Sequence, residues 1–167
     1  MQSPKSPRLA LTLLAFVAWV CGAPTLRPAD PTPAPDAAIE QAVLAANAEM
    51  IAAANRLDVD AFFDHIVDSD RGLIVQNGVI FRTRREAYEA VKRGLQGVAK
   101  IDRRMDSPQI TVIAPGAVLL VADGSVKATL ADGREMNSRF AVSLVFVLRD
   151  GRWKVLHGHY SMLPDRR

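Results

Sequence analysis

The Asp150-Gly151 dipeptide constrains the fold more than any other feature of this chain, because it separates two long apolar runs. A D-G pair between alternating hydrophobic residues is a strong signal for an antiparallel hairpin with a two-residue turn. We therefore predict one long hairpin over residues 139–161. Since side chains alternate between the two faces of a strand, one face of the second strand carries Trp153, Val155, His157, His159 and Ser161.

The two-residue turn also predicts which residues lie opposite one another. The predicted pairs are Leu148 with Trp153, Phe146 with Val155, Leu144 with His157, and Val142 with His159. The first-strand members of these pairs, together with Phe140, form an apolar row. Two histidines are thereby directed into an apolar face, which indicates a pocket. In the alternative interpretation, both histidines are core residues without a chemical role.

The N-terminal residues are typical of an exported protein. Lys5 and Arg8 precede an uncharged apolar run over residues 9–23, so we predict a secretory signal peptide over residues 1–22. Residues 23–36 form a proline-rich linker. The predicted location is periplasmic or secreted. Two alternatives stay open: a lipoprotein anchored at Cys21, and an uncleaved membrane anchor.

Composition limits the partners of the remaining chain. With 167 residues and 49% hydrophobic content, the sequence suits one globular domain, which we place at residues 37–163. The net charge of +3 falls to +1 once Lys5 and Arg8 are removed. We expect no nucleic-acid partner and no stable membrane span after processing. Cys21 is the only cysteine, so the processed domain would hold no disulfide.

Helical patterns come first in the domain and strand patterns follow. Apolar spacing predicts a helix over residues 37–56, a short helix capped by Asp58, and a third helix that begins at a capping box, Thr83 to Glu86. Asn77-Gly78 predicts a small hairpin between the second and third helices. From Val98 onward the runs favour strands. This segregation predicts an α+β fold, a curved antiparallel sheet wrapped around about three N-terminal helices.

Two stretches resemble a known family. They are the terminal D-G-x-W-K-V-x-H-x-H-x-S of residues 150–161 and the L-D-V-D-A-F-F of residues 57–63. With the order of elements, they resemble the nuclear transport factor 2-like (NTF2-like) superfamily, in its SnoaL-like branch, over residues 37–163. The resemblance implies a cone-shaped, cystatin-like roll with an internal cavity. Members of the superfamily include isomerases, cyclases and dehydratases as well as domains without catalysis.

A second turn extends the predicted pocket. If Asp132-Gly133 closes a two-residue loop, Asp123 lies opposite Val142, in line with His159. The same loop places Ser125 opposite Phe140. Arg103 could reach the cavity from the first long strand, but its charged neighbours Asp102 and Arg104 favour a place at the surface. The residues predicted to line the pocket are His157, His159, Ser161, Asp123, Ser125, Trp153, Phe140, Val142, Leu144, Phe146, Tyr88 and Phe63.

Such a pocket suits two classes of function. The first is non-catalytic binding of a small, largely apolar ligand or a partner. The alternative is a small, cofactor-independent enzyme of isomerase, cyclase or dehydratase type, with Asp123 or Asp64 as base and His159, His157 or Tyr88 as donor. The family's isomerases pair an aspartate base with tyrosine and acid donors, a constellation that is not matched residue by residue here. The short His157-x-His159 pair gives only a weak metal signal, and we predict neither metal nor cofactor.

The outer face of the hairpin predicts self-association. It carries the apolar row Val145, Val147, Leu156 and Tyr160. A sheet face of this composition is too apolar to stand in water. We therefore predict a homodimer through the outer sheet face.

Overall fold

The structure is a computed structural model that describes residues 34–69 and 74–164. All the described residues belong to one compact unit. The predicted signal peptide and most of the predicted linker lie outside the described residues. Within these, no helix is both long enough and apolar enough to cross a membrane.

Three helices form where the sequence places them. They are α1 (Ala34–Asn55), α2 (Val59–Asp64) and α3 (Arg84–Gly94). Helix α1 starts three residues before the predicted boundary, since Pro35 lies in its first turn, where a helix needs no backbone N–H. The Thr83 hydroxyl accepts a hydrogen bond from the Glu86 backbone N–H, and the Glu86 carboxylate accepts one from Arg82 N–H at 2.7 Å. The predicted cap at the start of α3 is thus confirmed.

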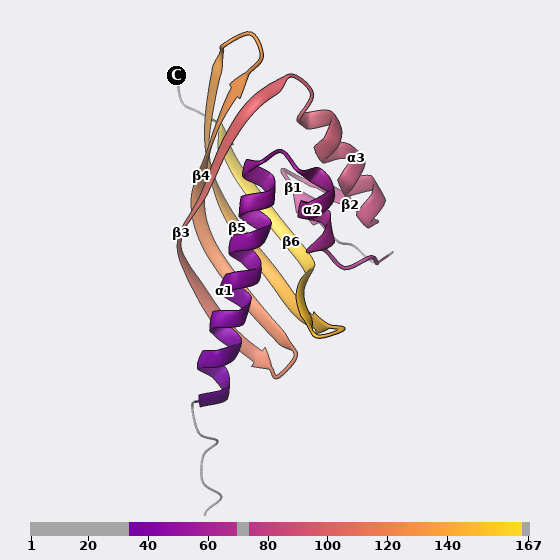
Figure 1. The fold of residues 1–167 in the computed structure, drawn as a ribbon, viewed down its shortest axis with the longest axis vertical. Helices are drawn as coiled ribbons and strands as arrows, with labels where there is room; N and C mark the ends of the chain where they lie inside the picture. Colours follow the sequence, from indigo (N-terminus) through magenta and orange to yellow (C-terminus); the bar gives the residue numbers. More distant parts are fainter. Residues whose placement is uncertain (1–33, 70–73, 165–167) are drawn as a thin grey trace, which may run out of the picture. The chain divides into compact units, whose positions relative to one another are not determined.

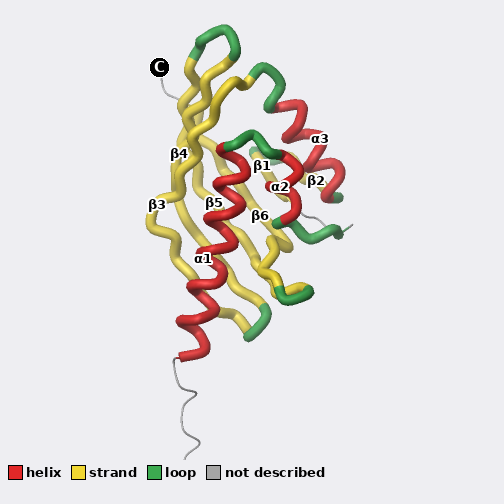
Figure 2. The backbone as a smooth tube through the Cα atoms, viewed as in Figure 1, coloured by secondary structure: helices red, strands yellow, loops and turns green. Residues whose placement is uncertain are grey.

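Six strands form one curved, unclosed sheet, with α1 lying across it (Figures 1 and 2). The strands are β1 (Ile74–Gln76), β2 (Val79–Phe81), β3 (Val98–Ala114), β4 (Ala117–Leu130), β5 (Glu135–Arg149) and β6 (Arg152–Pro164). Their order is β2-β1-β6-β5-β4-β3, and all neighbours are antiparallel except β1 and β6. The predicted α+β class, with a curved sheet and N-terminal helices, is confirmed.

The core lies between the helices and the inner face of the sheet. Its largest fully buried side chains are Phe63, Phe146, Leu120, Leu144, Val43, Val118 and Val155. The predicted apolar row of β5 is buried from Phe140 to Phe146, while Leu148 is 40% exposed. Burial on this scale is the main favourable term in folding a domain without disulfides.

A bulge in β6 reverses which side chains of its second half face the core. Next to the turn, Leu148 pairs with Trp153 and Phe146 with Val155, as predicted. The register then shifts, so that Leu144 lies opposite Gly158 instead of His157. One extra residue moves every later side chain to the other face. Beyond the bulge the buried positions are therefore Gly158 and Tyr160, while His159 and Ser161 are exposed, and the predicted pairings of His157 and His159 are wrong.

The β4–β5 register is also one residue from the prediction. Leu130 N–H donates to Arg134 O at 2.8 Å, which closes a three-residue loop instead of the two-residue loop expected at Asp132-Gly133. Asp123 consequently lies opposite Ala141, not Val142, and it is exposed. Ser125 in turn lies opposite Arg139 instead of Phe140. The buried neighbour on β4 is Gly124, where an added Cβ would clash with backbone and with the Phe140 ring.

Candidate ligand-binding cavity

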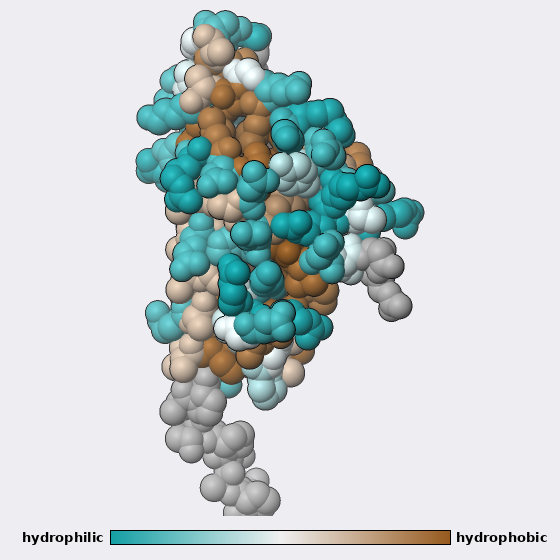
Figure 3. Space-filling model, turned by 45° about the vertical axis from the view of Figure 1, so that its right-hand side comes forward, coloured by the Kyte–Doolittle hydropathy of each residue, from teal (hydrophilic) through white to brown (hydrophobic). Residues whose placement is uncertain are grey.

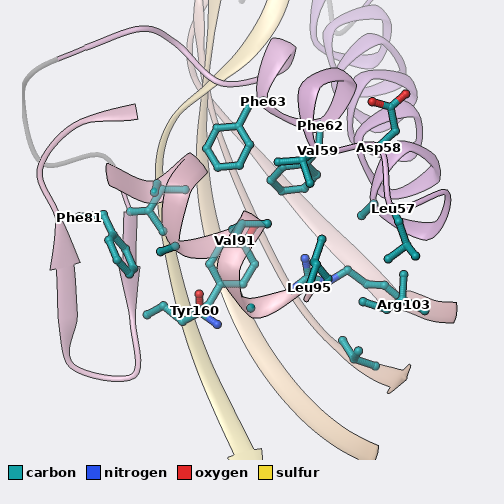
Figure 4. Close-up of a pocket in the computed structure, with 18 of the residues that line it drawn as sticks. Leu57, Asp58, Val59, Phe62, Phe63, Phe81, Val91, Leu95, Arg103 and Tyr160 are labelled. Carbon is teal, nitrogen blue, oxygen red and sulfur yellow. The ribbon is translucent and has the colours of Figure 1, made fainter. Parts of the chain in front are cut away.

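A cavity of about 410 Å³ lies between the helices and one end of the sheet (Figure 4). Its wall combines Ala54 of α1, the α1–α2 turn, α2, α3, β1 and β2 with two residues each from β3 and β6 and one from β4. Most lining side chains are apolar, among them Leu57, Phe62, Phe63, Phe81, Val91 and Leu95. Near this end of the sheet, hydrophobic surface is visible between polar side chains in Figure 3. Volume and composition fall in the range typical of small-molecule sites.

Two polar lining residues already have partners in the wall. Asp58 is the N-cap of α2, and its carboxylate accepts a hydrogen bond from the Ala61 backbone N–H at 3.0 Å. Gln76 donates its side-chain N–H to the sulfur of Met162 at 3.3 Å. Among the lining residues that the structure describes, Asp58 is the only carboxylate and none is a histidine. The lining thus offers few acceptors and no obvious general base besides Asp58.

Arg103 is the cation of the cavity. Its guanidinium carbon lies 4.9 Å from the centroid of the Phe140 ring and 5.2 Å from that of Tyr160. Its Nε is buried and has no hydrogen-bond partner among the described groups. None of the ion pairs within the described ranges involves Arg103. A positive charge therefore faces an apolar cavity with aromatic rings, and no acid, to stabilise it.

The last residue of α1 fixes the backbone that carries this cation. The Asn55 side chain accepts a hydrogen bond from Arg103 N–H at 2.7 Å and donates one to Arg103 O at 3.1 Å. Both backbone groups of Arg103 are thus bonded to one amide. This contact sets where β3 passes the end of α1, and with it the point from which the Arg103 side chain enters the cavity.

Tyr160 brings a phenol to the same wall. Burial raises the pKa of its hydroxyl, and the positive charge of Arg103 opposes that rise to a lesser extent. The phenol therefore stays protonated at neutral pH, and Tyr160 adds no negative charge to offset the guanidinium. The polar part of the wall is richer in hydrogen-bond donors than in acceptors.

The apolar residues predicted to line the pocket are mostly core residues. Of this group, Phe63 lines the cavity. Phe140 lies behind Arg103, outside the lining, and the core also takes Val142, Leu144 and Phe146. Trp153 is half-buried against the same core.

Tyr88 stands apart from the cavity because its hydroxyl donates to Asp60 Oδ1 at 2.9 Å. Its ring packs edge-on against Phe63, with 5.3 Å between the ring centroids. Tyr88 therefore supports a lining residue from behind and does not line the cavity itself.

The polar residues predicted for the pocket do not reach it either. His159, Ser161 and Asp123 are exposed, and Asp123 accepts a hydrogen bond from Arg139 at 2.8 Å. Asp64 is exposed and lies 3.8 Å from Arg84. The half-buried Ser125 and His157 are also absent from the lining. Among residues 34–69 and 74–164, no group of three potential metal ligands occurs.

Arg103 and Tyr160 were both misplaced by the sequence interpretation. Arg103 was expected at the surface because Asp102 and Arg104 flank it, but strand alternation groups it with Ile101 and Met105, which face inward. That alternation was the available signal. Tyr160 was expected in the outer row and moved inward with the bulge.

The curved sheet and the helices packed on it have the fold of NTF2-like proteins. Residues 43–165 match the SnoaL-like domain family, so the chain belongs to that family. The resemblance inferred from the sequence is confirmed. No curated protein matches the sequence significantly.

Solved structures support the same fold. An NTF2-like superfamily protein from Salmonella enterica serovar Typhimurium is 17% identical, with a TM-score of 0.70 over 78% of this chain and 94% of that one. A cystatin-like protein from Caulobacter vibrioides is 23% identical, with a TM-score of 0.62 over 74% and 89%. Hexachlorocyclohexane dehydrochlorinase LinA-type3 from Novosphingobium barchaimii is 11% identical, with a TM-score of 0.65 over 80% and 94%. At these identities the likeness concerns the fold alone.

Proposed function

We propose that this protein binds a small, largely apolar ligand in the cavity between α2, α3 and the sheet. The observation that carries the proposal is the cavity itself, about 410 Å³ in volume, with apolar walls and a few polar groups. Concave apolar sites with few polar groups are how proteins bury most of a small ligand's surface. The NTF2-like fold accommodates both ligand-binding proteins and small enzymes, so the residues of the cavity decide between the two.

Those residues favour binding over catalysis. The enzyme hypothesis needs a base and an oxyanion donor within reach of the same ligand. Asp123 and His159 are exposed outside the cavity, and Asp64 lies outside its lining. An isomerase, cyclase or dehydratase would have to use Asp58, whose carboxylate already caps α2. That alternative therefore ranks second.

A ligand-induced thermal shift tests the proposal. We expect apolar compounds with one polar end to raise the melting temperature of the wild type by a few degrees when present in large excess over Kd. Ala90→Trp fills the cavity from α3 and should abolish the shift. Glu89→Trp adds the same ring on the exposed side of α3 and should leave it unchanged. Equal shifts in all three proteins would contradict the proposal.

We propose in addition that the chain is exported. Lys5, Arg8, the apolar run over residues 9–23 and the prolines that follow support a signal peptide and a periplasmic or secreted location. The intact mass of the protein from its native host tests this, with a mature chain beginning near Ala23 as the expected result. A full-length chain in the cytoplasm contradicts it, and a diacyl group on Cys21 would replace it with the lipoprotein alternative.

A homodimer through the outer sheet face is a separate proposal. Tyr160 no longer belongs to that face, but Val121, which is 43% exposed, and the neighbouring Leu119 and Val145 lie there on adjacent strands. Apolar residues gathered on one sheet face support an interface. Light scattering should give twice the monomer mass at tens of micromolar, the scale of weak interfaces, and Val121→Glu should shift it to the monomer. A wild type that stays monomeric contradicts this.

A further inference from the structure

We propose that the ligand carries a carboxylate on an apolar body and that Arg103 binds this carboxylate inside the cavity. The inference rests on the proposed function and names its ligand class. It starts from the charge balance of the described lining residues, among which one guanidinium has no acidic partner and the only carboxylate, Asp58, caps a helix.

Four other arginines form ion pairs with aspartates, whereas Arg103 forms none among the described residues. Arg84, Arg104, Arg134 and Arg139 each lie within 3.8 Å of an aspartate oxygen. Arg103 has no such partner among the described residues, although its Nε is buried. Removing a charge from water is costly unless an opposite charge and hydrogen bonds replace the solvent. An incoming carboxylate would supply both.

The guanidinium is also held ready for such a partner. The Phe140 and Tyr160 rings lie 4.9 and 5.2 Å from its central carbon, and Asn55 bonds both backbone groups of Arg103. Ring contacts stabilise a cation through its face and supply no acceptor to the N–H groups at its edge, of which the Nε–H is buried without a partner among the described groups. Those N–H groups form a planar fork that suits the two oxygens of a carboxylate.

The rest of the wall sets the body of the ligand. Its other lining side chains are mainly aliphatic and aromatic, and neither Gln76 nor Tyr160 brings a second positive charge. One guanidinium balances one negative charge, so a monocarboxylate fits better than a phosphate dianion. The ligand class is thus a small monocarboxylic acid with an aliphatic or aromatic body.

Matched probes separate the charge from the apolar body. We would measure the affinities of 4-phenylbutanoate and its neutral amide, 4-phenylbutanamide, by calorimetry at low salt. The wild type should bind the acid at least about ten-fold more tightly than the amide, since a charge-assisted bidentate pair replaces a neutral contact. Arg103→Met should bring the two affinities within about two-fold of each other while leaving the amide affinity nearly unchanged.

Arg104→Met is the matched control, because it removes the same charge from the next residue, which is exposed and bonded to Asp102. It should keep the wild-type preference for the acid. Arg103→Lys should keep part of it, since the charge remains but the fork is lost.

The outcomes distinguish failure of the proposed function from failure of the carboxylate inference. If the wild type binds neither probe nor any other small apolar compound, the proposed function fails. If the amide binds as tightly as the acid, the cavity binds ligands but the carboxylate inference is overturned. A preference for the acid that survives in Arg103→Met also overturns it. If Arg103→Met does not fold, Arg103→Lys decides the matter, because a reduced preference for the acid supports the inference and an unchanged preference overturns it.

Discussion

Side chains alternate between the two faces in both halves of β6, but only in the first half do the predicted side chains face the core. Between the turn and Val155, the register follows from Asp150-Gly151 and the expected side chains face the core. Beyond the bulge, Tyr160 is buried and His159 is exposed, the reverse of the prediction. The difference teaches that turn chemistry sets register only as far as the ladder stays regular. The cavity depends on the second half, since Tyr160 lines it.

Contacts on the far side of β6 mark the place of the bulge. Val155 N–H donates to His65 O at 2.7 Å, and Val67 N–H donates to Val155 O at 2.9 Å. A few residues later, β6 pairs in parallel with β1, with Ile74 opposite Gly158. The strand therefore meets one neighbour before the bulge and another after it. The bulge lies between these two pairings.

The largest expected effect separates Tyr160 from His159. Tyr160→Ala should lower the free energy of unfolding by about 3–5 kcal/mol, as for other large core truncations, because Tyr160 is only 7% exposed. His159→Ala should cost less than about 0.5 kcal/mol, as exposed substitutions usually do. Urea denaturation measures both. A large loss of stability in His159→Ala together with a small loss in Tyr160→Ala would contradict the bulge and favour the regular register.

The next largest effect on stability is expected at Gly158, the first residue after the bulge that faces the core. An added Cβ at Gly158 would lie 3.1 Å from Leu144 and 3.2 Å from the Tyr160 ring. Gly158→Ala should therefore cost about 1–3 kcal/mol through overpacking. At Gly116 the nearest atom would be 3.9 Å away, so Gly116→Ala is the matched control and should be nearly neutral. Equal costs at the two glycines would argue against close packing beyond the bulge.

A smaller loss of stability, with a loss of affinity for the acid, should follow when the hydrogen bonds between Asn55 and the Arg103 backbone are removed. Asn55→Ala removes two hydrogen bonds to the Arg103 backbone and should cost about 1–2 kcal/mol. Affinity for 4-phenylbutanoate should fall more than affinity for its amide, because Asn55 acts by positioning the cation. Asn137→Ala, at an exposed position on β5, should change neither quantity. A parallel loss of both ligands would reduce Asn55 to a general structural role.

The smallest expected effect is a pH dependence of the free energy of unfolding that comes from His65, which is bonded to the first half of β6. Burial lowers the pKa of His65 from its usual value near 6.5, the negative charge of Glu49 partly opposing this. The unfolded chain then binds the proton more readily, so stability is fully present above pH 6.5 and decreases as the pH falls below it. Urea denaturation from pH 7.5 to 5.5 should show this slope in the wild type and in His159→Gln. The slope should flatten in His65→Gln; an unchanged slope there would assign it to other groups.

Local signals in the sequence were sufficient for the elements but not for their long-range pairing. The Asn77-Gly78 and Asp150-Gly151 turns each have positive φ at both residues, as such hairpins require, and Thr83 caps α3. A three-residue loop and a bulge then each moved the register by one residue. The loop had a local signal, since Gly133 has positive φ at its last position, whereas the bulge depends on which distant segments pair with the far edge of β6. The fold was therefore predictable, whereas most of the cavity lining was not.

A structure of the complex with 4-phenylbutanoate tests the central claim most directly. The account predicts the carboxylate at hydrogen-bond distance, about 2.7–3.0 Å, from the guanidinium nitrogens of Arg103. The phenyl ring should lie among the apolar lining residues Phe62, Phe81 and Val91. A ligand bound instead on the outer sheet face beside His159 and Asp123, with the cavity unchanged, would contradict it.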